Sequence, residues 1–209
     1  EPKVPLAWLY VDAYSRPGTK RGGAWMNPAM MRERLPDGSL QLPVAYVVCN
    51  QAPPSGSLAS QMSFTEVTTM FHEFGHALQQ LLTTVDDPDA SGIGNIEWDA
   101  VELASQFMEN WCFHKETLIG LTAHAETGAS LPEAIFDKIY AARQFRAASM
   151  LLRQCHLSAL DLELYARHDP SRETVLDAIV RIDAIATVEN VGIGAACQSI
   201  IANTAKQRI

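Results

Sequence analysis

Hydrophobic residues follow two different periods in this chain, and the change falls near residue 63. Before it, residues 6–14 are rich in aromatic and branched side chains, and residues 43–50 form a continuous apolar run, so both segments are predicted strands. The second strand is expected to be covered on most of both faces. Gly22 and Gly23 indicate a turn between the two strands. After residue 63 the apolar positions recur at helical spacing, so a strand- and loop-rich first half and a helical second half are predicted.

The first helix is predicted over residues 64–83. Ser63 is followed three residues later by Glu66, which is the spacing of a capping box at a helix start. The two faces of this helix differ in polarity, and the apolar face is expected to pack on a core. The polar stripe comprises Thr65, Thr69, His72, His76 and Gln80, and the apolar face comprises Phe71, Phe74 and Leu78.

Further helices are predicted after a turn-rich connection at residues 86–96. They cover residues 97–116, residues 132–167 with one break, and residues 171–186. The chain is therefore expected to be mainly α-helical, with a few strands near its N-terminus.

Composition excludes several classes of protein. The 209 residues are 47% hydrophobic and 19% charged, which is too apolar for a disordered chain. The net charge of −8 argues against binding to a nucleic-acid backbone, and no apolar run is long enough to span a membrane. The N-terminus lacks a secretory signal pattern, and the four cysteines include no Cys-x-x-Cys pair. We therefore expect a cytoplasmic protein with reduced thiols and with neither nucleic-acid nor membrane partners.

One motif carries chemistry, because residues 72–76 (HEFGH) fit H-E-x-x-H in the middle of the first predicted helix. His72 and His76 are four residues apart and lie on one helical face, so both imidazoles can reach a single Zn²⁺. Glu73 lies about 100° further round the helix, where it can contact water at the metal without being a ligand. The alternative is that the three side chains merely share a solvated face, and their place on an amphipathic helix favours the metal interpretation.

A catalytic zinc site needs a third protein ligand. Gln79 and Leu82 exclude the extended H-E-x-x-H-x-x-G-x-x-H pattern, which requires Gly and His at those positions. The remaining histidines receive no role from the sequence: His114, His124, His156 and His168. Polar side chains share one face of the second predicted helix: Asp99, Glu102, Gln106 and Glu109. Such a stripe usually faces water, but beside the histidine helix it can supply the third ligand, and spacing does not separate Glu102 from Asp99.

Five segments carry a resemblance to a known family: FHEFGHALQQLL, GNIEWDAVELASQFMENWCF, KRGGAWM, LPVAYVVCN and HAETGASLP. They resemble the thimet oligopeptidase family of zinc metallopeptidases, most closely its bacterial branch, over roughly residues 6–170. The resemblance implies a mainly α-helical, gluzincin-like catalytic core with a few N-terminal strands. It also implies Zn²⁺ as cofactor and hydrolysis of peptide bonds in short oligopeptides.

The resemblance assigns roles residue by residue. It implies that His72 and His76 are zinc ligands, that Glu102 is the third ligand and that Glu73 is the catalytic carboxylate. Asp99 is then expected to support a ligand histidine, since such histidines usually donate their free N–H to a carboxylate or carbonyl.

The sequence also departs from the family. Family members are much longer, and a His- and Gly-Tyr-rich segment contacts substrate and the developing oxyanion, whereas this chain has no tyrosine after Tyr165 and no histidine after His168. We expect a partial catalytic domain over residues 1–188 and a tail at residues 189–209 that does not match the family. Two alternatives to an active peptidase stay open: a zinc-binding but catalytically incomplete chain, and a non-enzymatic helical interaction module. In an active chain, Tyr140 and Tyr165 would be candidates to replace the missing oxyanion donor.

Overall fold

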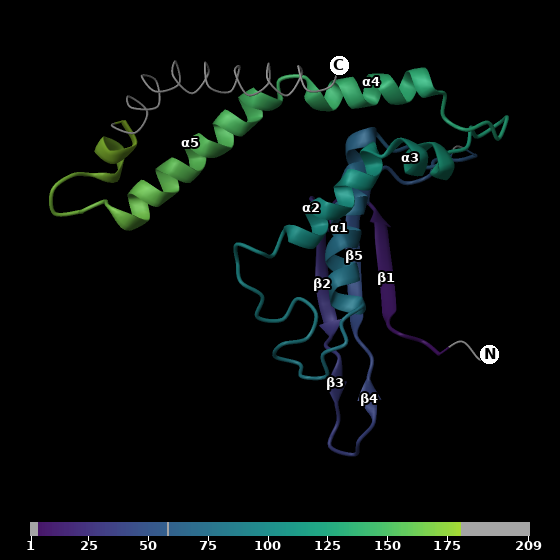
Figure 1. Cartoon of the computed structure of the whole chain (residues 1–209), viewed down its shortest axis with the longest axis horizontal. Helices are drawn as coiled ribbons and strands as arrows, with labels where there is room; N and C mark the ends of the chain where they lie inside the picture. The colour runs from purple at the N-terminus through teal and green to yellow at the C-terminus, as the bar shows by residue number, and fades with distance from the viewer. Residues whose placement is uncertain (1–3, 58, 181–209) are drawn as a thin grey trace, which may run out of the picture. The chain divides into compact units, whose positions relative to one another are not determined.

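The computed structural model describes residues 4–57 and 59–180 (Figure 1). The chain divides into two units, one up to Asp137 and one from Lys138 onward, and each is described by itself. The strands of the first unit are β1 (Trp8–Tyr14), β2 (Trp25–Met30), β3 (Glu33–Arg34), β4 (Leu40–Gln41) and β5 (Val44–Gln51). Its helices are α1 (Phe64–Leu81), α2 (Leu103–Glu109), the 3₁₀ helix η1 (Asn110–Phe113) and α3 (Lys115–Leu121).

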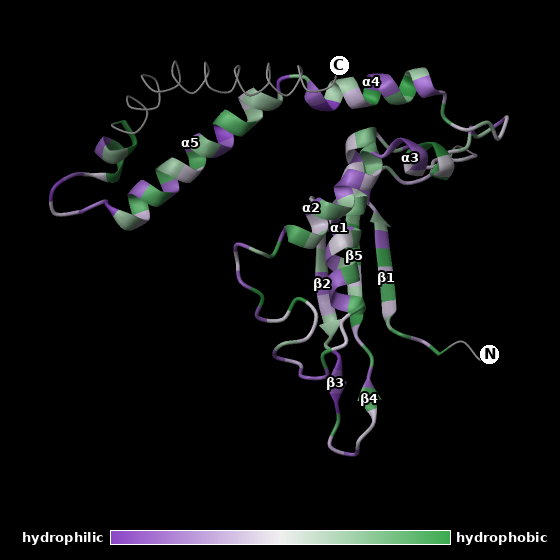
Figure 2. Cartoon of the chain, in the orientation of Figure 1, coloured by the Kyte–Doolittle hydropathy of each residue, from purple (hydrophilic) through white to green (hydrophobic). Residues whose placement is uncertain are grey.

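The first unit contains a three-stranded sheet with the strand order β1-β5-β2. The central strand β5 pairs in parallel with β1 and antiparallel with β2. Its largely hydrophobic sequence suits this central position (Figure 2). The strands predicted at residues 6–14 and 43–50 are confirmed as β1 and β5, with bounds that differ by at most two residues.

Strand β2 is absent from the sequence-based prediction. The glycines before it indicate a turn, and Pro28 argues against a strand because proline cannot donate a ladder hydrogen bond. The structure accommodates Pro28 in an edge strand, where the pairing with β5 becomes irregular between Pro28 and Met30. Edge position therefore explains a strand that local sequence rules do not predict.

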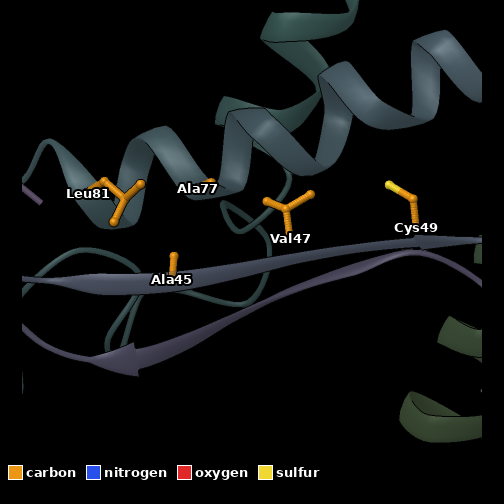
Figure 3. Packing of buried hydrophobic residues seen from close by; sticks show 5 residues of the cluster. All are labelled: Ala45, Val47, Cys49, Ala77 and Leu81. Atoms are coloured by element: carbon orange, nitrogen blue, oxygen red, sulfur yellow. The ribbon is translucent and has the colours of Figure 1, made fainter. Parts of the chain in front are cut away.

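One face of β5 packs against α1. Ala45, Val47 and Cys49 alternate along the strand and meet Ala77 and Leu81 of the helix, as Figure 3 shows. On the opposite face of the sheet Tyr46 stacks on Tyr10 with ring centroids 5.5 Å apart, and the Tyr46 side chain is 45% exposed. The prediction that β5 is mostly covered on both faces is confirmed except at Tyr46, which lies on the face that α1 does not cover.

Helix α1 begins as predicted. The side chain of Ser63 accepts the backbone N–H of Glu66, and the Glu66 carboxylate accepts the backbone N–H of Ser63 at 2.7 Å, so the capping box is confirmed. The expected core face is wrong at Phe74, which is 38% exposed. Small residues instead face the neighbours of α1, because the helix lies close to both the sheet and α2.

The helix predicted over residues 97–116 is replaced by shorter elements. Residues 98–102 form turns, α2 begins only at Leu103, and the extended backbone of His114 separates η1 from α3. The Asn110 side chain donates to the carbonyl oxygen of Phe107 at 3.1 Å and so competes with the helical hydrogen bonds where α2 ends. A continuous apolar period can thus be divided by local side-chain hydrogen bonds.

The second unit is helical in its described part. The helices are α4 (Glu133–Gln144), which begins in the first unit, and α5 (Ala147–Ala166). The predicted single break is confirmed between them, where Arg146 has a left-handed backbone with φ of 58°. Residues 175–180 are helical, and the rest of the helix predicted at 171–186 lies outside the described residues, as does the tail predicted at 189–209. No helix of the described part is long and apolar enough to cross a membrane.

The connection between α1 and α2 is held at two points. Arg32 Nε and Arg34 Nη2 each lie 2.7 Å from a carboxylate oxygen of Asp86. Further along, the side chain of Gln80 in α1 accepts the backbone N–H of Ile93 at 3.1 Å. These bonds hold the first part of the connection against α1 and the segment around the β3–β4 hairpin.

The Asp86 ion pairs predict a pH-dependent effect of Asp86→Asn on stability. Hydrogen bonds from Arg32, and then from Arg34, lower the pKa of Asp86 below its ordinary value of 3.8. A carboxylate whose pKa is lower in the folded chain stabilises it above the unfolded pKa, and this contribution is lost as the pH falls through the folded value. We therefore expect a lower urea midpoint for Asp86→Asn than for the wild type at neutral pH, and converging midpoints as the pH falls below about 4.

Urea unfolding followed by circular dichroism at several pH values tests this expectation. Asp89→Asn is the matched control, because Asp89 lies in the same connection and its carboxylate forms no ion pair within residues 4–57 and 59–180. A difference between wild type and Asp86→Asn that is independent of pH would contradict the assignment of stability to these ion pairs.

Candidate metal centre

Helices α1 and α2 approach each other unusually closely at Gly75. A Cβ atom added to Gly75 would lie 2.5 Å from the backbone oxygen of Ala104 and 2.6 Å from Cα of Ser105. Only glycine fits at this distance, so the second variable position of the H-E-x-x-H motif has a packing role. The contact brings the start of α2 beside the two motif histidines.

The two histidines and Glu102 converge at this contact. His72 Nε2 lies 3.1 Å from Glu102 Oε2, and His76 Nε2 lies 3.2 Å from the same oxygen. The three ligand atoms all lie within 4.8 Å of one another. In the part of the chain that the structure describes, this is the only group of three His, Cys, Asp or Glu side chains close enough to hold a metal ion.

The donor set fits a zinc ion. Two ligand atoms at about 2.0–2.1 Å from a tetrahedral zinc are separated by about 3.3 Å, the edge of the tetrahedron. The two Nε2–Oε2 separations of 3.1 and 3.2 Å agree with that edge. The Glu102 side chain is 48% exposed while His76 is 10% exposed, so the group is open to solvent on the Glu102 side. An open side is what a catalytic zinc site requires.

The other ring nitrogen of His72 has a carboxylate partner. His72 Nδ1 lies 2.6 Å from Glu109 Oε1. A carboxylate only accepts, so this bond places the ring proton on Nδ1 and leaves the Nε2 lone pair facing Glu102. Asp99 is exposed and bonds to neither motif histidine, so the expectation that it supports a ligand is wrong and Glu109 has that position. His76 Nδ1 is buried and has no hydrogen-bond partner among the described residues.

Burial shapes the ionisation of the group. It lowers the pKa of His76, although Glu102 opposes the shift, so the neutral imidazole that can bind a metal is favoured. Desolvation alone would raise the pKa of Glu102, but the hydrogen bond from Ser105 and the two histidines outweigh it, and the net shift is downward. The His76 imidazole and the Glu102 carboxylate are therefore each biased toward the form that binds a cation.

Glu73 lies on a different side of α1 from the histidines. Glu73 is buried, with 6% exposure. Burial raises the pKa of Glu73 and the charge of Glu102 adds to this, while His72 and the backbone of Met26 in β2 oppose it. Glu73 is thus influenced by both the metal-ligand group and the backbone of β2.

The remaining histidines lie outside this group. His114 bonds the Thr117 hydroxyl, His124 accepts backbone N–H groups of its own loop, and His168 lies near Glu173 in the second unit. His156 is a residue of α5 and also belongs to no metal-ligating group of the described residues.

Sequence reasoning missed three features of the site. Met26 lies on the unpredicted strand β2, and Ser105 and Glu109 have no assigned partners in the sequence analysis. A signal for the latter pair exists, because residues 102, 105 and 109 are spaced three and four apart and therefore share one helical face. That signal does not say which face meets α1.

Comparisons with known proteins show the family of this chain. The family model described as Peptidase family M3 matches residues 3–196. The chain is 52% identical over 182 residues to the organellar oligopeptidase A, chloroplastic/mitochondrial, of Arabidopsis thaliana, covering 85% of this chain and 23% of that protein. It is 43% identical over 181 residues to oligopeptidase A of Escherichia coli K12, covering 86% and 26%.

A more distant relative is named after the thimet oligopeptidase family, which the five sequence segments resemble. The thimet-like oligopeptidase of Dictyostelium discoideum is 32% identical over 179 residues, covering 85% of this chain and 26% of that protein. The chain thus spans about a quarter of the length of the curated relatives it matches. Because the family model matches nearly the whole chain, this protein belongs to peptidase family M3.

Proposed function

We propose that this chain is the catalytic core of a zinc-dependent metalloendopeptidase, with a gluzincin-like fold, that hydrolyses peptide bonds in short oligopeptides. The observation that carries the proposal is the convergence of His72 Nε2, His76 Nε2 and Glu102 Oε2, with the buried Glu73 next to His72 in the same helix. Membership of family M3 and relatives named oligopeptidases support peptide hydrolysis.

In this proposal His72, His76 and Glu102 hold the zinc ion. When bound, zinc supplies a Lewis acid that polarises the scissile carbonyl and lowers the pKa of water. Glu109 keeps the His72 ring in the tautomer that presents Nε2 to the site. Burial of His76 keeps its imidazole neutral, which is the form that binds a cation.

Glu73 is the proposed general base. It accepts a proton from the attacking water and delivers that proton to the leaving amine nitrogen. Its raised pKa makes the carboxylate a stronger base than an exposed glutamate.

Substrate and location are proposed from the relatives. Their names support short peptides as substrates, and one relative from Arabidopsis thaliana is named a probable cytosolic oligopeptidase A. Another is named chloroplastic/mitochondrial, so a cytoplasmic location stays a prediction. The lack of nucleic-acid and membrane partners also stays a prediction. Tyr140 and Tyr165, the candidate oxyanion donors, belong to the second unit.

The metal assignment predicts about one Zn²⁺ per chain, the stoichiometry of a mononuclear site. His72→Ala is expected to lose stoichiometric zinc, because two of the three protein ligands then remain. Elemental analysis of the purified chains after dialysis measures this. His114→Ala is the control, since His114 is exposed and outside the ligand group, and it should keep its zinc. Full zinc content in His72→Ala would refute the ligand assignment, and a wild type without zinc would favour the non-enzymatic interaction module.

The base assignment predicts that Glu73→Gln keeps zinc but hydrolyses peptide about 10²–10⁴-fold more slowly, the usual contribution of a general base. A quenched-fluorescent short peptide, assayed with and without chelator, measures the rate, and elemental analysis measures the zinc. Glu116→Gln, an exposed glutamate in α3, is the matched control. Wild-type turnover in Glu73→Gln would remove Glu73 from the mechanism, and zinc binding without hydrolysis by the wild type would favour the catalytically incomplete alternative.

A further inference from the structure

We propose that Ser105 is a positioning residue whose hydroxyl orients the Glu102 carboxylate as third ligand, with Gly75 providing the helix contact that brings Ser105 into place. This inference rests on the proposed function, because it concerns the same metal site. Ser105 belongs neither to the H-E-x-x-H motif nor to the polar stripe of the second predicted helix, so the sequence alone gives it no role.

Glu102 needs an orienting partner. It is the N-cap residue of α2, its side chain is 48% exposed, and it makes no capping hydrogen bond. A half-exposed glutamate has several rotatable bonds and samples many rotamers, so packing alone does not fix its carboxylate. A ligand that must be ordered on binding loses affinity to that entropy.

Ser105 provides the partner at the relevant atom. Its Oγ lies 2.8 Å from Glu102 Oε2, the same oxygen that both His72 and His76 face. Donation to an ionised carboxylate is a charge-assisted hydrogen bond, which is stronger than a bond to a neutral acceptor. The oxygen keeps lone-pair capacity for a cation, since a carboxylate offers about four acceptor sites.

A structural explanation competes with this one. Ser105 Oγ also lies 3.0 Å from the backbone oxygen of Glu102, and such a bond in the first turn of a helix is an ordinary local interaction. The hydroxyl has one proton, so it serves one acceptor at a time. Only the carboxylate bond acts on the ligand atom, and metal affinity therefore separates the two roles.

Gly75 explains why Ser105 is fully buried at this point. The backbone of α2 at Ala104 and Ser105 lies against Gly75, one residue before the ligand His76. A methyl group at Gly75 would push α2 away, and Glu102 would move with it. The close contact and the hydroxyl thus act together, one placing α2 and the other orienting its carboxylate.

Glu109 gives the same helix a second orienting role. It is four residues after Ser105, hence on the same face of α2, and it contacts the ring of His72. Ser105 and Glu109 therefore act on different ligands from one rigid element. Groups that orient ligands in this way typically change metal affinity by about 10–100-fold when removed.

The test compares Ser105→Ala with the wild type in the full chain. We expect the metal-free variant to stay folded by circular dichroism, and its zinc affinity, measured by chelator competition, to fall by about 10–100-fold. The visible absorption spectrum of the Co²⁺-loaded chain should also change, because it reports the geometry of the ligands. Ser91→Ala is the matched control: Ser91 is equally buried, but its Oγ accepts the Arg32 N–H, so only stability should change.

Gly75→Ala provides a second, independent variant. Displacement of α2 should weaken zinc binding by at least as much as Ser105→Ala. Gly120→Ala in α3 is its control, because an added Cβ there meets nothing within 4 Å. If Ser105→Ala does not fold, a folded Gly75→Ala chain still tests the helix contact that the positioning role requires: wild-type zinc affinity overturns the proposal, and weakened binding supports that contact.

The outcomes separate this inference from the proposed function. A wild type that binds no zinc refutes the proposed function itself. A wild type that binds zinc, together with a folded Ser105→Ala chain of equal affinity and unchanged Co²⁺ spectrum, overturns the positioning role and leaves the metal site intact.

Discussion

The backbone contact between α1 and α2 at Gly75 is the constraint on which the rest of the site depends. Helices packed through ordinary side chains have axes about 8–10 Å apart, and a glycine at the contact permits a closer approach. Here the backbone of Ala104 and Ser105 occupies the space that any Cβ at position 75 would need. Without this approach, a glutamate at the N-cap of a separate helix could not lie 3.1–3.2 Å from two histidine nitrogens on α1.

A second contact fixes α1 from the side of the sheet. Small side chains line it, with Ala77 of the helix against Ala45 and Val47 of β5. The helix is thus held between two neighbours, and successive residues of one motif face different partners. Glu73 is buried, and the backbone of Met26 in β2 influences its pKa, whereas His72 and the contact at Gly75 are directed toward α2. This division allows five consecutive residues to include the two proposed ligand histidines, the proposed base and a packing surface.

Electrostatics explains why a cation suits this position. Glu73, Glu102 and Glu109 lie around the histidine pair, and the charge of Glu102 adds to the rise in the pKa of Glu73. Carboxylates gathered at a partly buried place repel one another, and a divalent cation offsets that repulsion. The charge of Glu102 favours the protonated form of His76, but burial outweighs it, so the neutral imidazole of His76 is favoured. Packing and charge therefore favour the same occupant.

The sequence by itself determined the features that depend on neighbours within one helical turn. Only the tertiary structure decided which acidic residue faces the histidines. Glu102 and Asp99 share one spacing pattern, but Glu102 is the N-cap residue directly before α2, whereas Asp99 lies further back in the turns and has no helix to place it. Strand β2 and the role of Ser105 likewise depend on segments distant in sequence, and a local pattern contains no information about contacts made across such distances.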